Sequence, residues 1–192
     1  MGAWIKMISD EEADDDLRDV LKLARTPHGT VDNVMRVHSL RPSTMRGHVL
    51  LYRAALHDDA NTLPEWFQEI VSSYVSILND CAYSLANHWA NARYLIGDVA
   101  RADKIEKALL AHIPQDAFEG SELALLQYAE KLTLSPGTLA KADVDALRAA
   151  GIDDGQILEA NQIVSYFNYV NRCLNGLGVT TDGDVVGYYA ET

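Results

Sequence analysis

Residues 62–98 hold four side chains able to do chemistry: the carboxylate of Glu69, the thiol of Cys81, the hydroxyl of Ser84 and the imidazole of His88. A thiolate is a nucleophile, and a carboxylate or an imidazole can accept a proton. Ser84 and His88 are four residues apart, so they are neighbours on one helical face. Cys81 and His88 are seven residues apart, which is two turns along nearly the same stripe.

Two consecutive helices are expected to carry these residues. Apolar side chains recur at steps of three and four over residues 70–78, which predicts one apolar helical face. Thr62 and Glu65 have the spacing of a capping box at the start of the first helix. Residues 79 and 80 are Asn and Asp, which prefer helix ends to helix interiors, so the second helix is expected to begin near Cys81.

The position of Cys81 supports two interpretations. A thiol in the first turn of a helix lies near the positive end of the peptide dipoles, which favours the thiolate and lowers the thiol pKa. The same stripe continues through Leu85, His88 and Ala92, and it also describes a core face. Free cysteine is among the most buried residue types. On the pattern alone, Cys81 and His88 are therefore either reactive groups or packing residues.

The spacing of Glu69, Cys81, Ser84 and His88 resembles the motif of the alkylhydroperoxidase D and carboxymuconolactone decarboxylase superfamily, in its peroxidase-related branch. That motif is a Glu, then Cys-x-x-Cys, then three residues and a His, and Tyr83 matches the common Cys-x-Tyr-Cys form. Four further stretches are similar to the family, so the resemblance covers most of the chain: residues 33–42, 128–133, 147–151 and 166–172. It implies an alkylhydroperoxidase D-like bundle and a homo-oligomer, a dimer at least.

The chain departs from this motif at the second cysteine, which is Ser84 here. In the family the second cysteine attacks peroxide and the first one resolves the product, and a hydroxyl cannot be oxidised to a sulfenic acid. A peroxide reductase built on this chain would use Cys81 alone, with an external thiol reductant completing the cycle. By the resemblance, Glu69 and His88 form the proton relay, and Ser84 and Tyr83 supply hydrogen bonds, Tyr83 to the substrate.

Three functions stay open. The resemblance favours an enzyme, an antioxidant oxidoreductase that reduces hydrogen peroxide or organic hydroperoxides. The alternative is a carboxymuconolactone decarboxylase-like lyase or isomerase, in which Glu69 and His88 transfer protons without a thiol. The third is a non-catalytic oligomeric or binding protein. A serine hydrolase is disfavoured, since the sequence lacks the Gly-x-Ser-x-Gly nucleophile elbow.

Composition narrows the class of protein. The 192 residues have ordinary globular composition and are expected to form one domain over residues 1–192. The net charge of −12 disfavours a nucleic-acid partner. Two cysteines do not make a disulfide framework, which indicates a reducing, cytoplasmic compartment. No apolar run approaches the eighteen residues of a membrane span, so no membrane partner is expected.

The histidines and cysteines do not predict a metal or a cofactor. None of the histidines has zinc-site spacing with the two cysteines. Apart from His88, a surface or loop position is the default expectation for each histidine, namely His28, His38, His48, His57 and His112. Cys173, near the end of the last predicted helix, is expected to be a packing residue.

The helical patterns predict an all-α bundle of about seven or eight helices, with no hairpin signal. The expected helices cover residues 10–25, 42–57, 62–80, 81–97, 100–111, 123–132, 143–151 and a long one from 153 to about 176. Ser9 with Glu12, and Asp153 with Gln156, have capping-box spacing. The tail after Gly178 is either an extended arm against a neighbouring subunit or a loose terminus.

Overall fold

The computed structural model describes residues 2–189, and that part of the chain is all-helical. It contains nine α-helices and two 3-10 helices: α1 (Asp15–Leu23), α2 (Asn33–Arg36), α3 (Pro42–Leu56), α4 (Glu65–Leu78), α5 (Ala82–Ile96), α6 (Val99–Leu110), η1 (Pro114–Asp116), α7 (Gly120–Leu134), η2 (Pro136–Thr138), α8 (Lys141–Ala149) and α9 (Asp154–Leu177). The predicted all-α class is confirmed. The helix beyond the predicted count is α2, whose four residues are too few to show a helical period.

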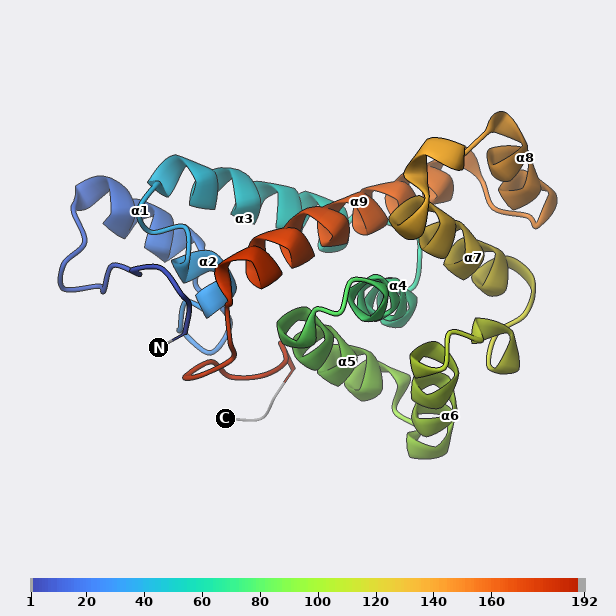
Figure 1. The fold of residues 1–192 in the computed structure, drawn as a ribbon, viewed down its shortest axis with the longest axis horizontal. Helices are drawn as coiled ribbons and strands as arrows, with labels where there is room; N and C mark the ends of the chain where they lie inside the picture. Colours follow the sequence, from blue (N-terminus) through green and yellow to red (C-terminus); the bar gives the residue numbers. More distant parts are fainter. Residues whose placement is uncertain (1, 190–192) are drawn as a thin grey trace.

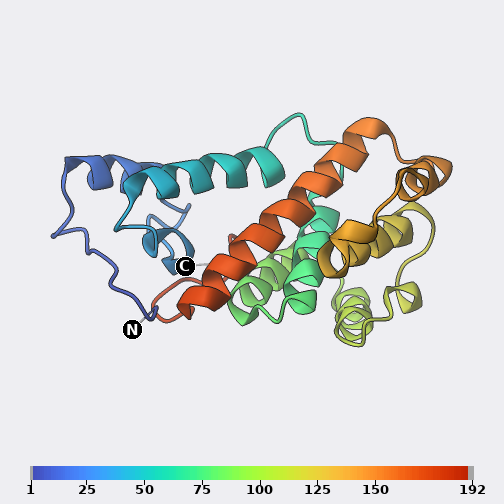
Figure 2. The same ribbon diagram turned by 45° about the horizontal axis from the view of Figure 1, so that its top comes forward.

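Helix α4 lies at the centre of the larger group of helices, where α5, α7 and α9 pack around it (Figure 1). Helices α1, α2 and α3 form a second group that contacts α9 through α3 (Figure 2). Each group encloses its own cluster of buried apolar side chains. The seam between the two clusters is where a cavity can form without opening either core.

Helix α4 is buried on all sides, since residues 67–76 are buried without interruption. The expectation of one apolar face was therefore too narrow. Its serines do not interrupt the packing, because each hydroxyl donates to a carbonyl one turn earlier: Ser72 to Gln68, Ser73 to Glu69 and Ser76 to Ser72, at 2.7–2.8 Å. A carboxylate on such a helix needs polar partners from neighbouring helices.

The turn between α4 and α5 confirms the break predicted at residues 79 and 80. Asp80 adopts a left-handed backbone with φ 50°. The Cys81 amide donates to the Ser76 carbonyl at 2.9 Å, and the Asp80 amide donates to the Ile77 carbonyl at 3.0 Å, which is a Schellman ending. Helix α5 therefore returns along α4 after three residues.

This antiparallel return sets which side chains of the two helices meet. Near the turn, the hydroxyls of Ser76 and Ser84 lie 2.9 Å apart. Two helical turns further out on each helix, Glu69 faces Asn91, whose amide donates to its carboxylate at 3.1 Å. The short connection thus brings a residue of the first central helix to the face of the second that carries His88.

Two of the three predicted capping boxes are wrong. Helix α4 begins at Glu65 after Pro64, and the amides of Thr62 and Leu63 donate instead to the carboxylate of Glu159 on α9. Ser9 and Glu12 do exchange hydrogen bonds, but they form a turn, and α1 starts later. The Asp153–Gln156 box at the start of α9 is confirmed.

The segment after α9, residues 179–189, folds back over its own chain and is called the C-terminal strap below. In Figure 1 the red end of the ribbon turns at the end of α9 and reaches α5. The Asp184 carboxylate accepts the Asn33 amide at 3.0 Å and the Tyr83 hydroxyl at 2.6 Å. Residues 179–189 are therefore packed on their own chain and are not a loose terminus. Residues 190–192 of the predicted tail lie outside the described part.

Within residues 2–189, none of the helices combines the length and the apolar character needed to cross a bilayer.

Candidate active site

A cavity of about 280 Å³ lies at the seam between the two apolar clusters. Helices α1, α2, α3, α5 and α9 contribute to its wall, and so does the C-terminal strap. Rings and aliphatic side chains make up much of the lining, among them Tyr52, Tyr83, Tyr166, Tyr188, Val49, Val170 and Leu174. Polar groups on one face of α5 also reach it, namely Ser84, Asn87, His88 and Asn91. A small, largely apolar molecule with few polar groups suits such a lining.

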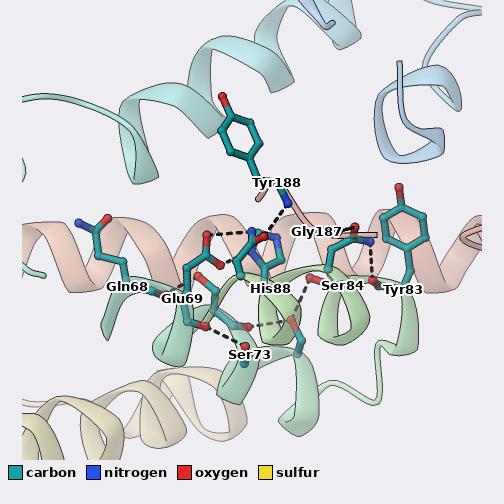
Figure 3. Close-up of polar contacts among 12 residues, drawn as sticks. Gln68, Glu69, Ser73, Tyr83, Ser84, His88, Gly187 and Tyr188 are labelled. Atoms are coloured by element: carbon teal, nitrogen blue, oxygen red, sulfur yellow. Dashed lines mark hydrogen bonds and ion pairs between the residues drawn. The ribbon is translucent and has the colours of Figure 1, made fainter. Parts of the chain in front are cut away.

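Glu69 and His88 form an acid–imidazole pair (Figure 3), and His88 is the member of the pair that lines the cavity. The Nδ1 atom of His88 lies 2.6 Å from Oε2 of Glu69. The side chains are 13% and 5% exposed for His88 and Glu69, so water screens the contact little. An ionised carboxylate only accepts, so in this contact Nδ1 is the donor, and Nε2 is the ring nitrogen that Glu69 leaves free. The ring packs edge-on against Phe167, at 4.5 Å between centroids.

The charge of Glu69 acts on groups around the cavity. Burial raises the pKa of the Tyr52 hydroxyl well above its ordinary value, and the Glu69 charge raises it further. Burial also lowers the pKa of His57, which the Glu69 charge opposes. Tyr52 and His57 are therefore neutral near pH 7. The lining also contains the ionisable side chains Arg25, Arg53 and Asp32, and Glu69 lies behind His88.

Cys81 does not have the environment that the dipole argument predicts. It is the N-cap residue of α5, but it is 1% exposed. Burial raises the pKa of its thiol, and the opposing hydrogen bonds from the Ser84 amide and the Asn171 side chain lower it by less. Cys81 is not among the described residues that line the cavity. The expectation of a low thiol pKa is wrong, because loss of hydration outweighs the helix terminus.

The acid and the imidazole of the motif meet; His88 lines the cavity, whereas neither Glu69 nor Cys81 is among the described residues of its lining. The other motif position that reaches the cavity is Ser84, whose hydroxyl lies 2.9 Å from that of Ser76. The Tyr83 ring also lines the cavity, but its hydroxyl is committed, since it donates to Asp184 and accepts the Val34 amide at 3.2 Å. Its ring, rather than its hydroxyl, is available to a ligand.

Asn91 is a site residue that the sequence argument missed. It is 3% exposed and lies three residues after His88, on the same face of α5. The three-residue spacing from His88 indicates a shared helical face, but the role of Asn91 depends on its hydrogen bond to Glu69, which the sequence does not show. Three further residues at the cavity were missed as well: Tyr188 in the strap, Asn87 directly before His88 on α5, and His57 at the end of α3.

His48, buried within α3, contradicts the surface or loop expectation for histidines, whereas its neighbour His38 lies in the turn between α2 and α3, as expected. His48 is 2% exposed, with Nε2 2.8 Å from the Tyr166 hydroxyl and Nδ1 3.0 Å from Nε2 of His38. His38 Nδ1 lies 3.0 Å from the Thr44 hydroxyl, which donates to the Arg41 carbonyl. The Arg41 carbonyl can only accept, so the Thr44 hydroxyl is its donor and must accept from His38. By the same reasoning along the chain, His48 donates to His38, and Tyr166 donates to His48. Both imidazoles are neutral, in keeping with the burial that lowers their pKa values, that of His48 to about 3.

Among the described residues, no three His, Cys, Asp or Glu side chains gather as they would around a metal ion.

Known structures share this architecture. The core of an alkylhydroperoxidase AhpD, an uncharacterised peroxidase-related protein from Ralstonia eutropha JMP134, superposes with a TM-score of 0.82 at 22% identity, covering 96% of this chain and 94% of that one. A peroxidase-related protein from Silicibacter sp. TM1040 gives 0.80 at 20% identity, covering 95% and 93%. The debrominase Bmp8 gives 0.73 at 16% identity, covering 95% and 92%. No protein-family model and no curated protein sequence matches the chain.

The chain therefore has the fold of the alkylhydroperoxidase AhpD core, as the motif resemblance predicted. Its activity is not fixed by that fold, since one protein of the same architecture is a debrominase.

Proposed function

We propose that this protein is an enzyme that moves a proton on a small, largely apolar substrate, with the Glu69–His88 pair as its acid and base. The observation that carries the proposal is the 2.6 Å contact between Glu69 and His88, with His88 at the wall of the cavity. A buried imidazole that a carboxylate holds in one tautomer is a poised general base. The reaction class is isomerisation or elimination at a carbon next to a carbonyl group.

Each residue has a role in the proposed reaction. His88 Nε2 takes a proton from an acidic C–H of the substrate. The electron pair of that C–H bond moves toward the neighbouring carbonyl oxygen of the substrate. The imidazolium that forms is stabilised by Glu69, which already accepts the Nδ1 proton. Return of the proton from Nε2 to a different carbon completes an isomerisation and restores the neutral ring. The Ser84 hydroxyl, on the same face of α5, is placed to hydrogen-bond the substrate.

Thiol-based reduction of a hydroperoxide by Cys81 is the second candidate function. The AhpD-core fold and the amide of Ser84 beside the sulfur favour it. In that reaction the thiolate attacks the O–O bond, which yields a sulfenic acid and an alcohol or water, and an external dithiol reduces the sulfenic acid back to the thiol and is itself oxidised to a disulfide. Because Cys81 is 1% exposed, this route requires a local opening of the chain.

Two assays on the same variants distinguish the candidates. The first follows deuterium uptake from D₂O into a panel of small cyclic ketones and lactones by NMR. We expect uptake to fall about 100-fold or more in His88→Gln and Glu69→Gln and to stay within about threefold in Cys81→Ser. The second follows consumption of hydrogen peroxide and cumene hydroperoxide with dithiothreitol. Peroxide consumption that Cys81→Ser abolishes, without enzyme-dependent deuterium uptake, would overturn the proposal.

A further inference from the structure

The C-terminal strap contacts the candidate site through its backbone. The Gly187 amide donates to Oδ1 of Asn87 at 3.1 Å, and the Tyr188 amide donates to Oδ1 of Asn91 at 2.6 Å. Figure 3 shows Gly187 and Tyr188 beside His88, with the Tyr188 ring pointing away from the pair. Both asparagines lie on α5, one turn apart. The strap is therefore held against the face that carries His88.

The other end of the Asn91 side chain touches the acid itself. Its Nδ2 atom donates to Oε1 of Glu69 at 3.1 Å, while Oε2 of Glu69 accepts from His88. One amide thus joins the strap backbone to the carboxylate that holds the imidazole. Asn87 makes no such link in the described structure: its Nδ2 donates to the Tyr83 carbonyl at 3.0 Å.

Asn91 matters for geometry because the last torsion of a Glu side chain is broad and roughly two-fold. With one oxygen fixed by His88 alone, the Glu69 carboxylate can rotate or swing away from the ring. A second donor on the other oxygen fixes its plane, and a carboxylate with two partners keeps its charge in a buried place at lower cost. The amide can hold this orientation only while its own oxygen is engaged by the strap.

We propose that Asn91 is a positioning residue for the Glu69–His88 pair and that seating of the C-terminal strap holds Asn91 in the orientation that aligns the pair. The strap is anchored at independent places. Asp184 is bound by Tyr83 and Asn33, and the Gly187 amide is bound by Asn87, so these anchors remain when the Tyr188 ring is removed. Displacing the strap therefore loosens the carboxylate without touching either member of the pair.

This inference rests on the proposed function, because it treats Glu69 and His88 as the reacting pair. Its test needs no turnover: the Nδ1 proton of His88, in a 2.6 Å contact, is followed by far-downfield ¹H NMR and by its exchange with solvent. We expect Tyr188→Pro, which deletes the amide that Asn91 accepts, to speed this exchange at least tenfold. Tyr188→Ala also removes the Tyr188 ring but keeps the backbone amide, so its exchange rate should stay within about twofold of the wild-type rate.

A second pair of variants tests Asn91 directly. Asn91→Leu should speed the exchange at least tenfold, and Asn87→Leu, which frees the strap at Gly187 but does not touch Glu69, should change it less than threefold. An exchange rate equal to that of wild type in both Asn91→Leu and Tyr188→Pro would overturn the inference.

Equal acceleration of the exchange in Tyr188→Pro and Tyr188→Ala would also overturn it. If Asn91→Leu fails to fold, the Tyr188 pair decides alone, since its change lies in the strap. Failure of the deuterium-uptake assay would remove the proposed reaction but leave this coupling measurable.

Discussion

At the scale of single residues, Cys81 lies where two effects on a thiol oppose each other. It caps α5, where peptide dipoles favour the thiolate, and it is 1% exposed, where loss of hydration favours the neutral thiol. Burial is the larger effect, so the thiol pKa is raised. Position along the helix could be predicted from the sequence, whereas the packing that removes water from the sulfur could not.

Alkylation of Cys81 tests this balance. In a Cys173→Ser background, which leaves one thiol, we expect iodoacetamide to modify Cys81 about 100-fold more slowly than free cysteine at pH 8, because the sulfur must be exposed by local opening. Mass spectrometry over time gives the rate. A Cys81→Ser variant, with Cys173 as its only thiol, is the control for access of the reagent. Rapid modification below pH 7 would contradict the raised pKa.

His48 belongs to the same scale. His48→Phe leaves the Tyr166 hydroxyl and a His38 nitrogen without their partner, and each buried group left unsatisfied costs about 1–3 kcal/mol. We expect a lower urea midpoint for the single variants His48→Phe and Tyr166→Phe. The double variant should lose less than the sum of the two, because it removes both partners of one hydrogen bond. Additive losses would show that the bond contributes nothing to the free energy of unfolding.

At the scale of elements, the end of α9 decides where the strap goes. Gly178 follows the helix with φ 59°, in the left-handed region, and a Cβ placed there would overlap the Trp4 indole. The Trp4 amide donates to the Leu177 carbonyl at 2.8 Å, so the N-terminal segment packs against this helix end. The strap therefore leaves α9 at a position that favours glycine on two counts.

Two glycines two residues apart make a matched test of that ending. Gly178→Ala should lower the free energy of unfolding by about 1–2 kcal/mol, because a left-handed backbone strains a residue with a Cβ. Gly176→Ala, within α9 and with open space around its Cβ position, should raise it by up to about 1 kcal/mol. Denaturant titration measures both. Equal effects of the same sign would contradict this account of the helix end.

At the scale of the whole molecule, the cavity exists because two apolar clusters meet without merging. The smaller cluster is built from α1, α2 and the first part of α3, and the larger one from the end of α3 and the rest of the bundle. The strap joins the two sides of the seam through Asp184 and Asn33. Asp32 and Asp184 lie close together there. Burial, and after it the charge of Asp184, raise the pKa of Asp32 to about 6. Stability should depend on pH through this seam and through His48.

The two groups act in opposite directions. Folded Asp32 keeps a proton that the unfolded chain releases near pH 4, so its contribution to stability is lost as pH rises from about 4 to about 6. In the folded chain the pKa of His48 is lowered to about 3, so this imidazole stays neutral at pH values where the unfolded chain binds a proton, below about 6.5. The contribution of His48 to stability is therefore lost as pH falls. Between about pH 4 and 6 the two slopes oppose each other.

Unfolding titrations at several pH values separate these terms. As pH falls from 6 to 4, the free energy of unfolding of Asp32→Asn should decrease more steeply than that of wild type. The variant lacks the stabilisation that wild-type Asp32 gains when it takes up a proton in this range. At pH 7 it should be at least as stable as wild type, since it removes a charge beside Asp184. Asp59→Asn, an exposed change of equal charge, is the control. Parallel pH curves for Asp32→Asn and wild type would contradict the raised pKa.

The sequence by itself determined the helical class, the break between the central helices and the candidate acid and imidazole. These depend on short-range periodicity and on residues such as Asn79 and Asp80, whose preferences act locally. Only the tertiary structure decided that Glu69 meets His88, that Cys81 lies away from the cavity and that Asn91 links the acid to the strap. Burial and contacts between distant segments depend on how whole helices pack, and no local pattern encodes them.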